Sequence, residues 1–233
     1  VRHAELVKRA KGEEGPVHIH VEHDTFKNVS EISVYTADHP GLFSVIAGAM
    51  ALTNGSIVDA KISTLSNGMA LDTFSVQDQA GDTFDSEQKI NRLAVRIDKA
   101  LKGEIYPANE LEKVTKSTMK SRRDVFTVPP RVLIDNKVSN HFTVVEVNGR
   151  DRLGFLYDVT RTLTDLGLQI NSAHISTYGE RAVDVFYVKD VFGLKVNSDG
   201  KLETIKGKLL ETITEENYHQ PKKRKKKKVD AAE

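Results

Sequence analysis

The chain of 233 residues contains no cysteine, so it forms no disulfide bond and performs no thiolate chemistry, a composition that fits the cytosol. It also lacks any run approaching the ~20 apolar residues that a membrane-spanning helix requires, and its first residues do not resemble a signal peptide. We therefore expect a cytoplasmic location and no membrane partner. Hydrophobic residues make up 39% of the chain and charged residues 29%, which is enough apolar material for the cores of two small domains.

Positive charge is concentrated near the end, where residues 222–228 are all lysine or arginine. Without this run and the acidic residues Asp230 and Glu233, 27 basic and 31 acidic residues remain, so the rest of the chain is mildly acidic. Blocks of like charge are usually solvated, and this one has no interleaved aromatic residue for base stacking. We predict a disordered basic tail over residues 219–233; contact with nucleic acid, or a nuclear import signal, is the alternative.

The chain begins with Val1 rather than methionine, inside a helical pattern at residues 3–9. This start predicts that residues 1–14 are the remnant of a helix from a preceding domain. We therefore interpret the sequence as the C-terminal piece of a larger protein.

An internal repeat is the most informative feature of the sequence. Residues 57–64 match residues 170–177 at a spacing of 113, with five of eight positions identical. An upstream aspartate and glycine recur at the same spacing, as Asp38 and Gly41 and as Asp151 and Gly154. Five downstream residues recur at a spacing of 112, as Ala70, Asp72, Phe74, Val76 and Asp78 and as Ala182, Asp184, Phe186, Val188 and Asp190. The chain therefore holds two copies of one domain.

The first copy has a clear pattern of predicted elements. A β-rich run at residues 32–36 leads through a turn at 38–41 into a helix whose apolar residues recur every three or four positions. Two strands joined by the turn at residues 66–68 follow, since Asn-Gly is a strong hairpin signal. A second helix, at residues 86–101, ends the unit.

The second copy repeats this pattern. A strand is predicted at residues 142–147, a turn at 148–151, and a helix with its apolar stripe between Leu156 and Leu166. The hairpin turn falls at residues 178–180, and the last helix covers about residues 200–214.

Each copy is one strand short of a βαββαβ unit, and a β-rich run precedes each, at residues 17–21 and 131–134. A strand joined by a short loop to the next lies antiparallel beside it. We therefore predict an α+β fold of two tandem ferredoxin-like domains, each sheet completed by the strand that precedes the unit.

The predicted boundaries place the first domain at residues 15–103 and the second at 130–218. The linker at 104–129 includes a possible helix at 111–123. Pro129 and Pro130 mark its end, because proline cannot continue a helix.

The residues now support a resemblance to ACT domains, whose pattern is a strand, an Asp-x-x-Gly turn, a helix and a hairpin opening with Ile-x-x-Ala-x-Ile. The longer strings at residues 142–154, 165–170 and 184–188 are more specific. They are similar to the C-terminal tandem ACT region of bifunctional uridylyltransferase/uridylyl-removing enzymes. The resemblance covers roughly Arg2 to Tyr218.

This resemblance implies a parent enzyme whose nucleotidyltransferase and phosphohydrolase-type domains modify nitrogen regulatory protein PII, while the ACT domains sense glutamine. It implies Mg in the parent enzyme and no cofactor in this chain. The sequence has no paired-Asp nucleotidyl motif, no His…His-Asp metal pattern of credible spacing and no favoured Ser-His-Asp arrangement, so we expect no catalytic residue here. A stand-alone ACT-repeat ligand-binding protein is the alternative, and dimerisation through exposed sheet edges stays open.

The turn between the first strand and helix of each copy has the chemistry to bind an amino acid. A helix N-terminus suits a carboxylate, glycine permits close approach, an aspartate can receive an ammonium group, and Asn171 can both donate to and accept from a side-chain amide. In ACT pairs the other wall often comes from the neighbouring domain. The expected binding residues are Asp38, Pro40, Gly41, Leu42, Phe43, Asp59, Asp151, Gly154, Phe155, Leu156, Asn171 and His174.

Two observations weigh against this interpretation. An aspartate before a glycine is commonly just an Asx turn or a helix cap. Family members also usually carry proline where Leu153 stands, as the first copy does at Pro40, which bears on the geometry of the second turn.

The histidines His18, His20 and His23 lie close together in the sequence and suggest a zinc site. The second copy has no counterpart of them, and no further ligand is placed to complete a site. We interpret them as polar residues of an edge strand and expect no metal.

Overall fold

The computed structural model describes residues 17–118 and 128–214. The predicted N-terminal helix at 1–14 and basic tail at 219–233 lie outside the described residues. The strands are β1 (Val17–Asp24), β2 (Val29–Ala37), β3 (Ser56–Lys61), β4 (Met69–Gln77), β5 (Arg131–Asp135), β6 (Thr143–Arg150), β7 (Leu168–Tyr178) and β8 (Arg181–Asp190). The helices are α2 (Leu42–Leu52), α3 (Glu87–Leu101), α4 (Pro107–Thr118), α5 (Phe155–Asp165) and α6 (Asp199–Ile213).

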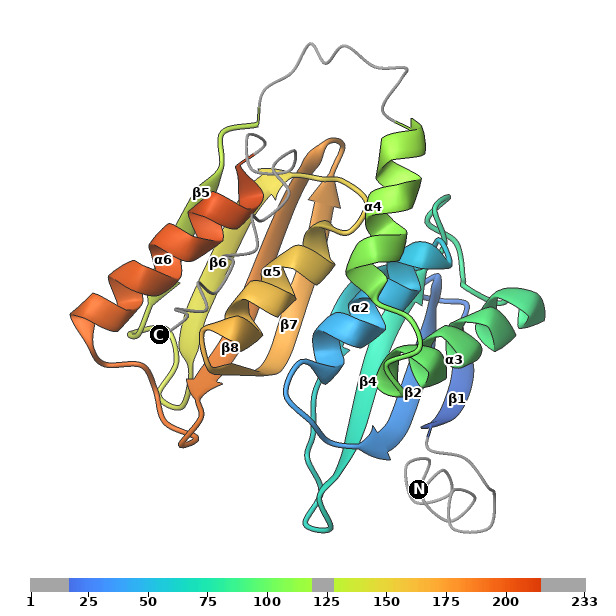
Figure 1. Cartoon of the computed structure of the whole chain (residues 1–233), viewed down its shortest axis with the longest axis horizontal. Helices are drawn as coiled ribbons and strands as arrows, with labels where there is room; N and C mark the ends of the chain where they lie inside the picture. The colour runs from blue at the N-terminus through green and yellow to red at the C-terminus, as the bar shows by residue number, and fades with distance from the viewer. Residues whose placement is uncertain (1–16, 119–127, 215–233) are drawn as a thin grey trace, which may run out of the picture.

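All eight strands form one antiparallel sheet in the order β1-β2-β4-β3-β7-β8-β6-β5. The described helices cover one face of this sheet, as Figure 1 shows, and within residues 17–118 and 128–214 they leave the other face open. Each repeat contributes four neighbouring strands, and equivalent strands of the two repeats lie at equal distances from the centre of the sheet. The predicted α+β class and tandem ferredoxin-like organisation are confirmed.

Each half of the sheet is completed by the strand that precedes the repeat in the sequence, as predicted. β1 pairs antiparallel with β2, and β5 pairs antiparallel with β6. In a ferredoxin-like sheet this outer position belongs to the last strand, and here a preceding strand occupies it. A tight connection with Asn28 in the left-handed region, at φ 52°, joins β1 to β2.

The repeats join through their β3 and β7 strands, which meet at the centre of the sheet. Asp59 pairs with His174 and Ala60 with Ala173 in the register, and both alanines are buried. The Ile62 backbone N–H donates to the Asn171 carbonyl at 2.9 Å just beyond the ladder. This continuous pairing fixes the start of β7 against the end of β3.

Helix α2 lies near the middle of the helical layer, because eight of its eleven residues are buried and it contacts α3, α4 and α5. Its close approach to two neighbours depends on Gly48. A Cβ at this position would lie 2.7 Å from the Pro107 Cβ and 2.9 Å from the Tyr157 ring. α2 is therefore held by elements from both repeats and from the segment between them.

The second β-to-helix turn lies later than predicted. Residues 148–151 were expected to form it, but β6 continues through Arg150 and the turn begins at Asp151. Gly149 is a residue of strand β6, and a side chain does not fit there because a Cβ would lie 2.8 Å from the Phe155 ring. The glycine therefore serves packing against α5.

The linker helix begins earlier than the predicted residues 111–123. α4 starts at Pro107, a residue favoured in the first turn, where its missing N–H costs no hydrogen bond. The last five residues of the predicted range, 119–123, lie outside the described part of the chain.

Candidate ligand-binding site between the two repeats

A pocket of about 330 Å³ lies where the first repeat's β2–α2 turn faces the start of β7 in the second repeat. Its walls come from both repeats. The first contributes Asp38, His39, Pro40, Gly41, Leu42, Phe43, Ile62, Thr64 and Asp72, and the second Thr164, Gly167, Leu168, Gln169, Ile170, Asn171, Lys189 and Val191. Six predicted site residues therefore meet in one cavity: Asp38, Pro40, Gly41, Leu42, Phe43 and Asn171.

Gly41 gives the pocket its helix N-terminus. It caps α2 in the left-handed region, at φ 86°, a conformation that glycine adopts without a Cβ clash. No side chain caps α2, and the Ser44 hydroxyl instead donates to the Gly41 carbonyl at 2.8 Å. The Leu42 amide donates to the His39 carbonyl at 3.2 Å and the Val45 amide to the Gly41 carbonyl at 3.1 Å. The amides of Phe43 and Ser44 have no acceptor within the helix, and the helix dipole is positive at this end. This end of the pocket suits a carboxylate.

Asp38 fixes the turn to the neighbouring hairpin. Its Oδ2 accepts a hydrogen bond from the Thr64 hydroxyl at 2.5 Å, and its backbone N–H donates to the Gly68 carbonyl at 3.2 Å. The Asp38 side chain is exposed at the pocket mouth. It therefore combines a structural contact with a negative charge facing the cavity.

Asp72 is a pocket residue that the sequence analysis did not place in the site. Its side chain extends from β4 and is only 1% exposed. Its Oδ1 accepts from the Ser63 backbone N–H at 3.3 Å, while Oδ2 has no hydrogen-bond partner in the described chain. Burial raises the pKa of Asp72 to about 7; the Ser63 hydrogen bond lowers it and the charge of Asp38 raises it further. In the sequence, Asp72 could have been singled out because the same aspartate recurs in the second repeat as Asp184.

The wall from the second repeat carries polar side chains at the start of β7. Gln169 and Asn171 are exposed there, and Lys189 on β8 lies beside them. The Asn171 backbone is held by its carbonyl bond to Ile62, which leaves its side-chain amide for the cavity. An amide can donate and accept at once, so this wall suits a polar ligand side chain.

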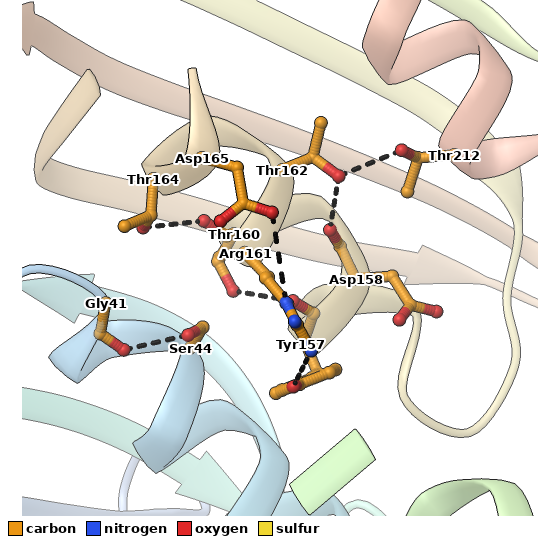
Figure 2. A network of polar contacts seen from close by, with 10 residues as sticks. All are labelled: Gly41, Ser44, Tyr157, Asp158, Thr160, Arg161, Thr162, Thr164, Asp165 and Thr212. Atoms are coloured by element: carbon orange, nitrogen blue, oxygen red, sulfur yellow. Dashed lines mark hydrogen bonds and ion pairs between the residues drawn. The ribbon is translucent and has the colours of Figure 1, made fainter. Parts of the chain in front are cut away.

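Helix α5 carries a polar network, which Figure 2 shows near the first turn of α2. The Arg161 guanidinium donates to the Tyr157 hydroxyl at 2.9 Å and lies 3.9 Å from an Asp165 carboxylate oxygen. At the end of the helix, Thr164 lies opposite Gly41, where a Cβ would be 3.6 Å from its methyl group. The end of α5 and the start of α2 thus meet at the pocket rim.

Two further predicted residues lie outside the pocket. Asp59 and His174 face each other across the β3–β7 pairing, with the His174 Nδ1 2.5 Å from the Asp59 Oδ1. The imidazole also contacts the Tyr187 ring edge-on, with the ring centroids 6.1 Å apart. Because side chains alternate along a strand, this pair points to the face opposite the buried Ala60 and Ala173, the open face of the sheet.

The corresponding turn of the second repeat has a different environment. Gly154 caps α5 with φ 81°, as Gly41 caps α2, but a Cβ at Gly154 would lie 3.2 Å from a methyl group of Leu111. Leu111 belongs to α4 and is 4% exposed. The predicted residues Asp151, Gly154, Phe155 and Leu156 therefore lie at a turn against which α4 packs, and the two repeats are not equivalent.

The buried aspartate recurs in the second repeat as Asp184, which is 1% exposed. Neither of its carboxyl oxygens has a hydrogen-bond partner among the described residues. Burial raises the pKa of Asp184 to about 8, the Ser176 amide opposes this rise, and the charge of Asp151 adds to it. Both repeats therefore bury one carboxyl group beneath the turn aspartate.

The histidines of β1 have local partners. His20 Nε2 lies 3.2 Å from a Glu22 carboxylate oxygen, and His23 Nδ1 lies 2.9 Å from the Ser30 hydroxyl. Within residues 17–118 and 128–214, no three histidine, cysteine or acidic side chains converge as a metal site would require. In the same part of the chain, no helix has the length and apolar character to cross a membrane.

Comparison with known proteins agrees with this architecture. A family model described as the ACR family N-terminal ACT domain matches residues 138–216, which contain the second repeat from β6 to α6. Bifunctional uridylyltransferase/uridylyl-removing enzymes match 92% of the chain, at 52% identity in Azospirillum brasilense, 49% in Rhodospirillum rubrum and 46% in Gluconobacter oxydans. The chain spans 23% of the length of each of these relatives.

A solved structure of an unknown protein from Galdieria sulphuraria matches over 78% of this chain and 89% of its own, with 13% identity and a TM-score of 0.24. The family model, the repeat and the paired ferredoxin-like sheets agree with one another. Residues 138–216 match an ACT domain, and over 92% of its length the chain is similar to part of the bifunctional uridylyltransferase/uridylyl-removing enzymes.

Proposed function

We propose that this chain is an allosteric amino-acid sensor, and that its ligand is glutamine. The observation that carries the proposal is the pocket between the repeats, where an open helix N-terminus, two carboxyl groups and a side-chain amide converge. Its volume of about 330 Å³ is at the lower end of the ~300–1,000 Å³ typical of small-molecule sites. An amino acid with a polar side chain fits both the chemistry and the size.

The ligand lies across the two repeats in this proposal. Its α-carboxylate faces the first turn of α2, its ammonium group faces the acidic side of the pocket, and its side-chain amide faces Asn171 and Gln169. One ligand binds per chain, because Leu111 packs against the second turn at Gly154.

A ligand that contacts both repeats can report its presence by changing how they pack. The pocket adjoins the β3–β7 pairing and the contact between α2 and α5, so closing around a ligand shifts both. By linkage, glutamine must bind two conformations with different affinity, since a ligand with equal affinity for both shifts nothing.

We further propose that the sensor serves a parent enzyme that uridylylates and deuridylylates nitrogen regulatory protein PII in the cytoplasm. The support is the uridylyltransferase/uridylyl-removing activity for which the relatives are named, because they match 92% of the chain at 46–52% identity. In this proposal the catalytic domains and their Mg belong to the parent enzyme, and the ACT pair contributes regulation.

Isothermal titration of the purified chain with L-glutamine tests the proposal, with L-glutamate and L-serine as ligand controls. Glutamine binds with a stoichiometry of one, and Asn171→Leu weakens it at least about tenfold by removing a hydrogen-bonding amide. His174→Ala, on the same strand but outside the pocket, leaves the affinity unchanged.

The same substitutions in the full-length parent test the regulatory part. Asn171→Leu makes uridylylation and deuridylylation of PII less responsive to glutamine, while His174→Ala does not. Equal glutamine responses in wild type and Asn171→Leu would contradict the proposed control.

A further inference from the structure

Asp72 differs from every other acidic residue of the pocket in being buried with a free oxygen. Its side chain points from β4 to the same side as the fully buried Phe74, beneath the helices. Oδ1 is held by the Ser63 amide, and Oδ2 has no partner within the described residues while the residue lines the cavity. Burying a carboxyl group in this way is costly unless something pairs with it.

Asp38, the other carboxyl group of the pocket, is already engaged. Its Oδ2 accepts from Thr64, and its backbone N–H is bonded to the Gly68 carbonyl. These contacts fasten the β2–α2 turn to the β3–β4 hairpin. A cation entering the pocket therefore finds an unused, buried acceptor at Asp72 and a solvated, occupied one at Asp38.

We propose that the Asp72 carboxylate is the acceptor for the cationic amine of the ligand, while Asp38 positions the turn and adds negative charge. The inference rests on the proposed function and deepens it by assigning the residue that selects for an ammonium group. The ligand class is a primary amine that also carries a carboxylate, because the α2 N-terminus and Asp72 belong to the same cavity. A carboxylic acid without the amine leaves Asp72 unpaired and is rejected.

Binding of this kind releases a proton near neutral pH. The pKa of Asp72 is raised to about 7 by burial, so part of the population carries a neutral carboxyl group. An arriving ammonium group favours the ionised form, and the proton leaves for solvent. The titratable groups that share the pocket are Asp38, which raises the pKa, together with His39 and Lys189. Helix α2 has no acidic residue in its first turn.

The second repeat supplies a matched control. Asp184 is the counterpart of Asp72 in the repeat and is equally buried, at 1% exposed, and like Asp72 it has a carboxyl oxygen without a hydrogen-bond partner among the described residues. It does not line the pocket between the repeats. Asp72→Asn and Asp184→Asn thus remove the same type of buried carboxyl group, and only the first removes one from the ligand site.

The test is calorimetric titration of the full chain with L-glutamine and with its desamino analogue, glutaramic acid, between pH 5.5 and 8. In the wild type, glutamine affinity rises up to about tenfold per pH unit below pH 7 and levels off above it. Titrations in buffers of different ionisation enthalpy show roughly half a proton released per glutamine at pH 7. Asp72→Asn weakens glutamine about 10- to 100-fold at pH 8 and abolishes the pH dependence.

Asp184→Asn and the wild type give the same affinities and the same pH profile in this account. Glutaramic acid binds the wild type at least about tenfold more weakly than glutamine does, and Asp72→Asn narrows this difference. Glutamine binding that is equally tight in Asp72→Asn, or that releases no proton from the wild type at pH 7, would overturn the assignment of Asp72 alone. Absence of binding by glutamine and by every other amino acid would overturn the proposed function as well. The proton measurement needs no variant, so it decides the matter even if Asp72→Asn folds poorly.

Discussion

The buried carboxyl group of Asp184 makes the stability of this protein depend on pH. The residue is 1% exposed, and burial raises its pKa from 3.8 to about 8. Between pH 4 and 8 the folded chain therefore holds a proton that the unfolded chain has lost. Stability falls as pH rises wherever the folded state binds more protons, by up to about 1.4 kcal/mol per pH unit for one group.

Asp184→Asn removes this dependence because an amide does not titrate. The free energy of unfolding of the variant, relative to wild type, should increase by roughly 3 kcal/mol between pH 5 and pH 7 and level off above pH 8. Any pH-independent effect of the amide cancels in this difference. Contributions of ionisable groups that do not interact with Asp184 also cancel, since both proteins contain them.

Urea denaturation followed by circular dichroism at pH 5, 6, 7, 8 and 9 measures the effect. Asp165→Asn is the control: its side chain is 64% exposed and its ion pair with Arg161 is long, at 3.9 Å. The control should track the wild type at every pH. A constant difference between Asp184→Asn and wild type across this range would refute the claim that Asp184 is buried and protonated.

Three further substitutions test the packing around the two turns. Gly41→Val places a β-branched residue at φ 86°, so it should cost roughly 1–2 kcal/mol in thermal unfolding and abolish glutamine binding by calorimetry. Gly48→Ala forces α2 away from its neighbours and should cost about 1–3 kcal/mol in urea, whereas Gly200→Ala, with no atom within 4 Å of the new methyl group, should cost nothing. Leu111→Ala should cost roughly 2–5 kcal/mol and speed amide exchange at Phe155, as α4 loses its contact with the second turn.

Much of the fold follows from the repeat in the sequence. The spacing of 113 aligned two copies, and the β-rich runs before each copy predicted β1 and β5 as the strands that complete the sheet. The first turn was placed correctly because Pro40 and Gly41 together mark it. The second lacks the proline, and Gly149 was taken as a turn residue although it is a strand residue that makes room for Phe155.

The joining of the two halves of the sheet and the different environments of the two turns depend on contacts between residues that are distant in the sequence. No local sequence pattern in β3 or β7 predicts that these strands pair with each other, although the small residues Ala60 and Ala173 are compatible with such pairing. Leu111 contacts Gly154 because the segment between the repeats carries α4 to the second turn. This segment is not part of the repeated pattern, so its path could not be predicted from the repeat.

Part of the pocket lining was expected from the sequence. The alternation of β4 places Asp72 on the same side as Phe74, so a buried carboxyl group was readable from the pattern, but its proximity to the turn was not. Asp59 and His174 were expected at the ligand, and the structure instead pairs them across the centre of the sheet, on its open face. The face of the sheet to which a strand residue points can be predicted from the alternation of side chains along the strand. Which turn lies above that face can be known only from the folded structure.

Hydrogen–deuterium exchange with and without L-glutamine tests most directly whether one ligand bridges the two repeats. The account predicts simultaneous protection of amides in the first turn of α2, at residues 42–45, and at the start of β7, at residues 168–171. It predicts no direct protection at residues 152–156 of the second turn. Protection confined to one repeat, or centred on Gly154, would contradict a single ligand site between the repeats.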